Sequence, residues 1–196
     1  MKAYKDYVIT PIGDRYNNSA RVGNKELILN TEIVNHQYVN RLAKVIATPL
    51  LFQSPINVGD EVIVHHNIFR RWHDVKGRER NSSSYWEDNK YIISQEQIYL
   101  YKSNKLWNAV NGYSLVKPIK SKDKFSLSLE KESMGVVKYS DGSFCVNDLV
   151  GFRPGTQCED FINGERLYRV MNKFITIKYE YQGNEEEYNP SWAQSS

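Results

Sequence analysis

The chain has 196 residues, of which 40% are hydrophobic and 25% charged, enough for compact cores beneath a charged surface. Its net charge of +3 is too small to indicate nucleic-acid binding by itself. No apolar stretch approaches the roughly 18 residues of a membrane span, and residues 1–6 lack a signal-peptide core, so we expect a soluble protein that is not secreted. Its two cysteines, Cys145 and Cys158, are too few for a disulfide framework and fit a reducing compartment.

Three short apolar runs occur twice in the same order. The paired runs are residues 7–12 and 114–119, 58–64 and 146–152, and 91–100 and 168–177. They are rich in β-branched and aromatic residues and are separated by Gly, Pro, Asn and Asp, whereas helical periodicity is scarce. We therefore predict an all-β chain of two small domains, residues 5–103 and 110–182. A polar C-terminal tail, residues 183–196, is expected to be loose.

The spacing of matched landmarks locates the loops. The pairs are Pro11 and Pro118 (107 residues apart), Ala43 and Gly135 (92), Asp60 and Asp148 (88), and Ile98 and Ile175 (77). Each fall in spacing marks a segment that is longer in the first copy, and such insertions belong in surface loops because strand registers cannot absorb them. The loop between Pro11 and Ala43 is the longest. Asp60 and Asp148 occupy equivalent turn positions in the two copies. A role in forming these turns explains them better than paired acid–base catalysis does.

This order of landmarks resembles the GroES-type co-chaperonin family. The family has a strand leading to a Lys-Pro or similar dipeptide, a long flexible loop, a small-residue strand, a Val-Gly-Asp-x-Val strand and a final strand pair. The matching segments are residues 8–12, 13–40, 42–47, 57–64 and 91–101, and then 115–119, 120–133, 135–139, 145–152 and 168–179. The resemblance covers nearly the whole chain. It implies two tandem GroES-like partly closed β-barrels and a homo-oligomeric ring that caps a GroEL-type chaperonin, with no enzymatic activity and no cofactor.

In this family the first loop docks on the chaperonin through an aliphatic triplet, to which Leu27, Ile28 and Leu29 are similar. Leaving such side chains exposed costs about 1.5 kcal/mol or more each relative to burial, so a partner groove that buries them would explain the triplet. Glu26 and Asn30 depart from the family, which has glycine there. The alternative for the triplet is an ordinary buried strand.

The second copy has a shorter first loop, whose candidate docking residues are Phe125, Leu127 and Leu129. Apolar and polar residues alternate there, so a half-buried edge strand explains the pattern equally well. The family's roof hairpin is missing, since residues 48–55 are too short for it, and the long segment 65–90 is the candidate for a covering role. The resemblance implies the cytoplasm of a bacterium or of a phage-infected host.

Two other functions compete with the co-chaperonin. The first is a structural or assembly protein, viral for instance, that reuses the barrel without docking a chaperonin. The second is single-stranded nucleic-acid binding, in which basic residues contact phosphates and aromatic rings stack on bases. Its residues would be Arg70, Arg71, Trp72, Arg78 and Arg80. Neighbouring acidic residues dilute this patch and the second copy lacks it, which argues against nucleic acid as a partner.

No metal site is expected. His65 and His66 are adjacent and would point to opposite faces of a strand, and no cysteine or carboxylate joins them at ligand spacing. Cys145, on the strand before Asp148, is expected to be a small core residue.

Overall fold

A computed structural model describes residues 2–16, 19–23, 25–28, 39–110, 112–123, 129–162, 164–180, 183 and 185–190. In these ranges the regular elements are strands and two short 3-10 helices, so the all-β prediction is confirmed. The chain divides into two compact units, unit 1 (Met1–Leu106) and unit 2 (Trp107–Ser196).

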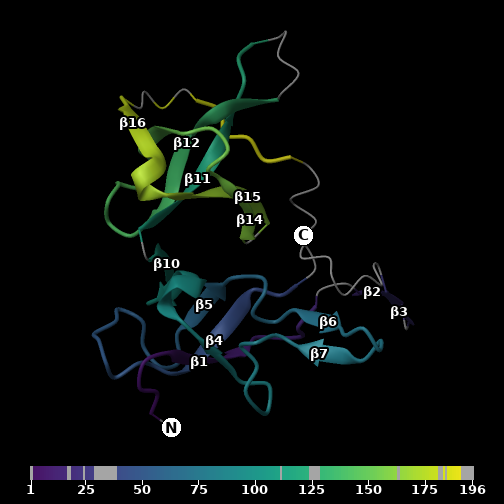
Figure 1. Cartoon of the computed structure of the whole chain (residues 1–196). Helices are drawn as coiled ribbons and strands as arrows, with labels where there is room; N and C mark the ends of the chain where they lie inside the picture. Colours follow the sequence, from purple (N-terminus) through teal and green to yellow (C-terminus); the bar gives the residue numbers. More distant parts are fainter. Residues whose placement is uncertain are drawn as a thin grey trace. The chain divides into compact units, whose positions relative to one another are not determined.

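The first sheet has six antiparallel strands in the order β10-β9-β5-β4-β1-β8. Figure 1 labels β1, β4, β5 and β10 of this sheet. Two further pairs, β2–β3 and β6–β7, form separate two-stranded sheets. The strands are β1 (Tyr7–Pro11), β2 (Ser19–Val22), β3 (Lys25–Ile28), β4 (Leu42–Ala47), β5 (Glu61–Val64), β6 (Arg71–His73), β7 (Glu79–Asn81), β8 (Tyr91–Ile93), β9 (Ile98–Ser103) and β10 (Leu106–Ala109).

The second sheet also has six antiparallel strands, in the order β14-β15-β11-β12-β13-β16. They are β11 (Tyr113–Lys120), β12 (Glu130–Ser140), β13 (Leu149–Phe152), β14 (Cys158–Ile162), β15 (Glu165–Met171) and β16 (Ile175–Tyr179). Among the described residues neither sheet closes into a barrel, so the two partly closed barrels remain a prediction.

Five strands of each sheet follow the same order. In the first sheet it is β8, β1, β4, β5, β9, and in the second it is β15, β11, β12, β13, β16. The registers agree as well, since Pro11 pairs with Ala43 just as Pro118 pairs with Gly135. The landmarks matched in the sequence therefore lie at corresponding positions of the two sheets.

The irregularities of the two sheets also correspond. The register between the first two long strands shifts between Val8 and Ile9 in unit 1, and between Leu115 and Val116 in unit 2. A single 3-10 turn precedes the last of the five strands in each sheet. These turns are η2 (Gln95–Gln97) and η3 (Asn172–Phe174).

Asp60 and Asp148 act in turns, as the sequence predicted. A carboxylate oxygen of Asp60 accepts the backbone N–H of Asn57 at 2.8 Å, and one of Asp148 accepts that of Cys145 at 3.0 Å. In each unit this hydrogen bond closes the turn that precedes a strand, which is β5 in unit 1 and β13 in unit 2. The prediction that Cys145 is a core residue is wrong, because the turn places it at the surface.

The long segment 65–90 contributes to the core of unit 1. Ile68 and Phe69 are buried, and the Phe69 ring meets the Tyr91 ring edge to face with centroids 4.8 Å apart. Arg15 donates to the backbone carbonyl of Phe69 at 3.1 Å. The segment therefore covers apolar surface of its own unit before it forms the β6–β7 hairpin.

The C-terminal segment, residues 185–190, differs from the expected loose tail. The Tyr188 N–H donates to the Pro118 carbonyl at 2.8 Å, and the Lys120 N–H donates to the Glu186 carbonyl at 2.7 Å. The reason is that β15 pairs with residues 113–116 of β11 and leaves the same side of residues 117–120 open. The segment fills that place.

Candidate functional site

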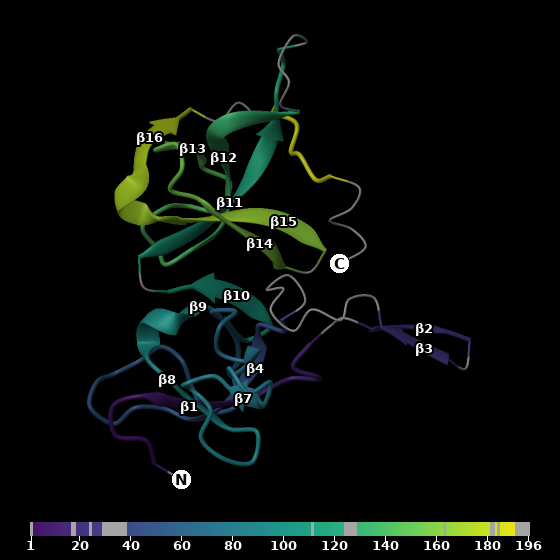
Figure 2. The ribbon, with the colours of Figure 1, turned by 45° about the vertical axis from the view of Figure 1, so that its right-hand side comes forward.

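Two residues of the candidate docking triplet, Leu27 and Ile28, lie on the β2–β3 hairpin, which comes between β1 and β4 in the chain. Figure 2 shows the hairpin away from the strands of the six-stranded sheet, and its register pairs Ala20 with Leu27 and Ser19 with Ile28. The Leu27 side chain is 51% exposed. Ile28 ends β3, and Leu29 lies outside the described residues. Leu27 is thus on a strand, but it is not buried in the core of its unit.

The second candidate loop is described only at its ends. Phe125 and Leu127 lie outside the described residues, and Leu129 is 69% exposed. The Ser121 N–H donates to the Leu129 carbonyl at 3.0 Å, and Lys120 pairs with Glu130 across β11 and β12. The two sheet strands therefore hold the ends of this loop together.

The basic residues proposed for nucleic-acid binding gather on the β6–β7 hairpin and the residue before it. Trp72 is exposed and lies opposite Arg80 across the hairpin. Arg71 forms an ion pair with Glu79 at 3.0 Å, and Arg80 forms one with Asp74 at 3.1 Å. Arg78 is exposed and Arg70 is half-buried. Two of the four arginines are thus engaged by acidic neighbours within the hairpin, which weakens the patch for phosphate binding.

The carboxylate of Asp74 shapes this hairpin. It accepts the backbone N–H groups of Lys76 and Arg78 at 2.9 and 3.0 Å. The hydrogen bond from Arg78 is the main reason that the pKa of Asp74 lies below its usual value.

The prediction that His65 and His66 point to opposite faces of a strand is wrong. Their rings stack with centroids 4.2 Å apart and do not lie on opposite faces of a strand, because both residues follow the end of β5. Among the described residues, no three His, Cys, Asp or Glu side chains are grouped so as to hold a metal ion.

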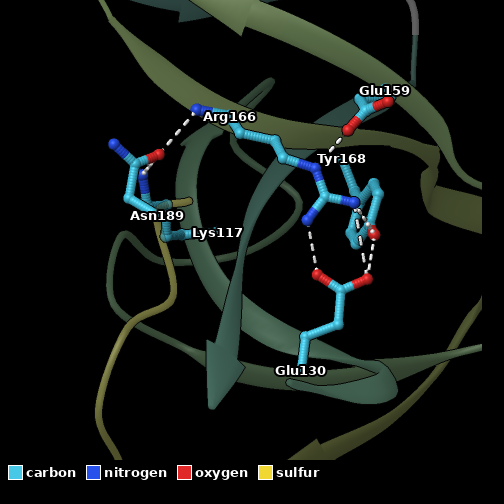
Figure 3. A network of polar contacts seen from close by, with 6 residues as sticks. All are labelled: Lys117, Glu130, Glu159, Arg166, Tyr168 and Asn189. Carbon is cyan, nitrogen blue, oxygen red and sulfur yellow. Dashed lines mark hydrogen bonds and ion pairs between the residues drawn. The ribbon is translucent and has the colours of Figure 1, made fainter. Parts of the chain in front are cut away.

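Unit 2 contains a polar network that the sequence did not single out (Figure 3). The Arg166 guanidinium donates to Glu130 at 2.5 Å and to Glu159, and it also donates to the Tyr168 hydroxyl oxygen at 2.5 Å. The Tyr168 hydroxyl in turn donates to Glu130. The network joins the first residue of β12 to the β14–β15 hairpin.

Burial and these bonds shift the pKa values of the network. Burial lowers the pKa of Arg166, but the bonds to Glu130 and Glu159 outweigh it, so the pKa rises and the side chain stays charged. Burial, followed by the bond to Glu130, raises the pKa of Tyr168. The tyrosine is therefore a neutral hydrogen-bond donor.

Lys117 and Asn189 lie on the opposite side of the Arg166 backbone in Figure 3. The Lys117 side chain is 2% exposed, and its ammonium group donates to the Asn189 amide oxygen at 2.9 Å. The nearest oxygen of Glu165 is 3.8 Å away. Burial lowers the pKa of Lys117, and Glu165 and Glu187 oppose that shift. An ammonium group this deeply buried depends on the acceptor that Asn189 supplies.

One signal in the sequence could have marked Lys117, since it is a charged residue inside an apolar run, where the first copy has Thr10. Nothing local could have named Asn189, which lies 72 residues further along the chain.

No protein-family model matches this chain, and no curated protein is significantly similar to it. None of the helices in the described ranges has the length and hydropathy of a membrane span.

Proposed function

We propose that this protein is a co-chaperonin made of two tandem GroES-type domains, which assembles into a homo-oligomeric ring and caps a GroEL-type chaperonin. The observation that carries the proposal is Leu27, a half-exposed leucine on a hairpin inserted between β1 and β4, where the family has its docking loop. Leu27, Ile28 and Leu29 are the proposed docking residues of the first copy, and Phe125, Leu127 and Leu129 those of the second.

The matching strand orders and registers support the tandem arrangement. Two sheets that share five strands in one order, with register shifts at corresponding places, fit duplication of a single domain. Partly closed barrels are part of this proposal.

A sheet edge without a neighbour among the described strands supports the oligomer. In the described part of the chain β16 is the last strand of the second sheet, and its Ile177 and Tyr179 side chains are 48% and 37% exposed. Its counterpart β9 has β10 beside it. An edge strand with apolar side chains is suited to pairing with another copy.

Weak individual docking fits a lid that must leave in each cycle. Burying the remaining exposed half of one leucine contributes about 1 kcal/mol, and ordering a loop costs about 2–5 kcal/mol of the contact energy. Several loops presented by one ring regain affinity through effective concentration. The proposal needs no catalytic group, because nucleotide hydrolysis belongs to the chaperonin.

The test is capture of the intact chain by a GroEL-type chaperonin, with and without ATP, at micromolar concentration. We expect nucleotide-dependent binding that falls at least tenfold in Leu27→Ser. Val75→Ser is the matched control, because Val75 is a fully exposed aliphatic residue on the β6–β7 hairpin of the same unit. The proposal fails if the intact chain does not bind, or if both variants bind equally well.

A structural or assembly protein is the second candidate, and one observation favours it. Residues 19–22 and 25–28 of the first loop pair as a hairpin, whereas a docking loop is expected to order when it meets its partner. Failure of the capture experiment, together with stable large assemblies of the chain alone, would select this candidate.

A further inference from the structure

The C-terminal segment lies along β11 as an added strand. Glu187 and Ile119 form an antiparallel bridge, flanked by the two backbone hydrogen bonds at Lys120 and Pro118. Such strand addition is a common way for a protein to bind an extended peptide, because backbone bonds supply affinity and alternate side chains supply specificity.

The side chains of the segment contact lysines of β11 and β12. Glu187 forms an ion pair with Lys138 at 2.6 Å, and Asn189 accepts from Lys117 and from the Arg166 backbone N–H, the latter at 3.0 Å. Residues two apart on a strand face the same way, so a Glu-x-Asn spacing meets both lysines. Glu186 pairs with Lys120.

This lysine-lined edge belongs to unit 2 alone. The corresponding positions of unit 1 hold no lysine. Unit 1 has Thr10 in place of Lys117, Gly13 in place of Lys120 and Ile46 in place of Lys138. Since unit 1 forms the same five-strand order with those residues, the three lysines are not required by the strand order. Their positive charges instead complement the acidic segment that lies against them.

The outer contacts of the segment are weak. Lys120 and Glu186 are 46% and 69% exposed, and ion pairs between exposed groups add little to stability. Ordering six residues costs conformational entropy that the two backbone bonds and the exposed ion pairs offset only in part. The buried Lys117–Asn189 contact is the stronger one, and a peptide that displaces the segment has to supply the same acceptor.

We propose that the edge of β11 from Lys117 to Lys120 is a binding site for an extended acidic peptide with Glu-x-Asn spacing, and that residues 185–190 are its resident, displaceable occupant. The Asn189 amide is the specificity contact, because a peptide without an acceptor there leaves the buried Lys117 ammonium without its closest hydrogen-bond partner. This inference is independent of the co-chaperonin proposal.

The test uses a fluorescent peptide of residues 183–192 and the change in its anisotropy. A chain ending at Glu180 should bind the peptide at least tenfold more tightly than the full chain does. A peptide with residues 188 and 189 exchanged, which turns the asparagine to the other face, should bind at least tenfold more weakly. Lys138→Ala in the truncated chain should weaken binding severalfold, whereas Lys122→Ala, an exposed lysine outside the edge, should not.

Equal binding of the two peptides, or of the full and truncated chains, would overturn the proposal, as would no binding by a truncated chain that keeps amide protection in β11 and β12. If truncation unfolds unit 2, the full chain with Asn189→Ala serves instead. It keeps the segment but loses the specificity contact, so it should bind the free peptide at least tenfold more tightly than the unchanged chain. Equal affinity would then reject a displaceable occupant.

Discussion

Among the described glycines, Gly135 has the least room for a side chain. A Cβ added there would lie 2.3 Å from the Lys117 carbonyl oxygen and 2.6 Å from a methyl carbon of Val116. Ordinary contact begins near 3.4 Å, so the β11 backbone would have to move by roughly 1 Å at the Lys117–Val136 pairing. Overpacking of this kind costs about 3 kcal/mol. We therefore expect Gly135→Ala to lower the free energy of unfolding of unit 2 by about that amount.

The assay is urea unfolding followed by hydrogen exchange of peptides from each unit, which reports unit 2 separately from unit 1. Ala43→Gly is the matched control, because Ala43 holds the corresponding position of unit 1 and pairs with Pro11. It should cost about 1 kcal/mol, the usual effect of glycine within a strand. A change below about 0.5 kcal/mol in unit 2 for Gly135→Ala would refute the steric reasoning.

Two further predictions concern charges of unit 2. Arg166→Met should lower the free energy of unfolding of unit 2 by about 2 kcal/mol. This is less than the usual cost of breaking a buried ion pair, because Glu159 is 41% exposed. Urea unfolding should show that adding Glu130→Gln recovers part of this loss, and strictly additive effects would contradict the network. Burial raises the pKa of Asp141, but hydrogen bonds from Ser143 and Asn172 outweigh it and hold the pKa below its ordinary value. A lowered pKa means that this carboxylate stabilises the fold fully above about pH 4 and loses its effect as the pH falls through the folded-state pKa. Asp141→Asn should therefore shift the urea midpoint at pH 7 but much less at pH 2.5, and an equal shift at both would contradict this.

Local patterns were enough to predict the all-β class and the strands that the two sheets share, but not the β2–β3 and β6–β7 hairpins. Short runs of β-branched and aromatic residues specify strands, and an aspartate just before a strand can cap a turn, so Asp60 and Asp148 were correctly assigned. The spacing of Pro11, Ala43 and their counterparts anticipated which residues pair, because insertions accumulate in loops and leave registers unchanged.

Local patterns failed where a side chain's surroundings come from elsewhere in the chain. Cys145 is exposed because its turn carries it outside the sheet, and His65 and His66 stack because the strand ends before them. Leu27 was selected as an exposed aliphatic residue, and the structure finds it half exposed, but on a paired strand and not in a loop.

The all-β class, the order of the apolar runs and the turns between them could be predicted from the sequence, since they depend on residues a few positions apart. Two contacts could not be predicted in this way, namely the position of Arg166 between Glu130 and Glu159 and the hydrogen bond between Lys117 and Asn189. The Lys117–Asn189 contact forms because β15 covers only part of β11 and leaves an edge that a segment some 70 residues away can fill. Which segment fills an open edge depends on the path of the whole chain, and no local pattern encodes that path.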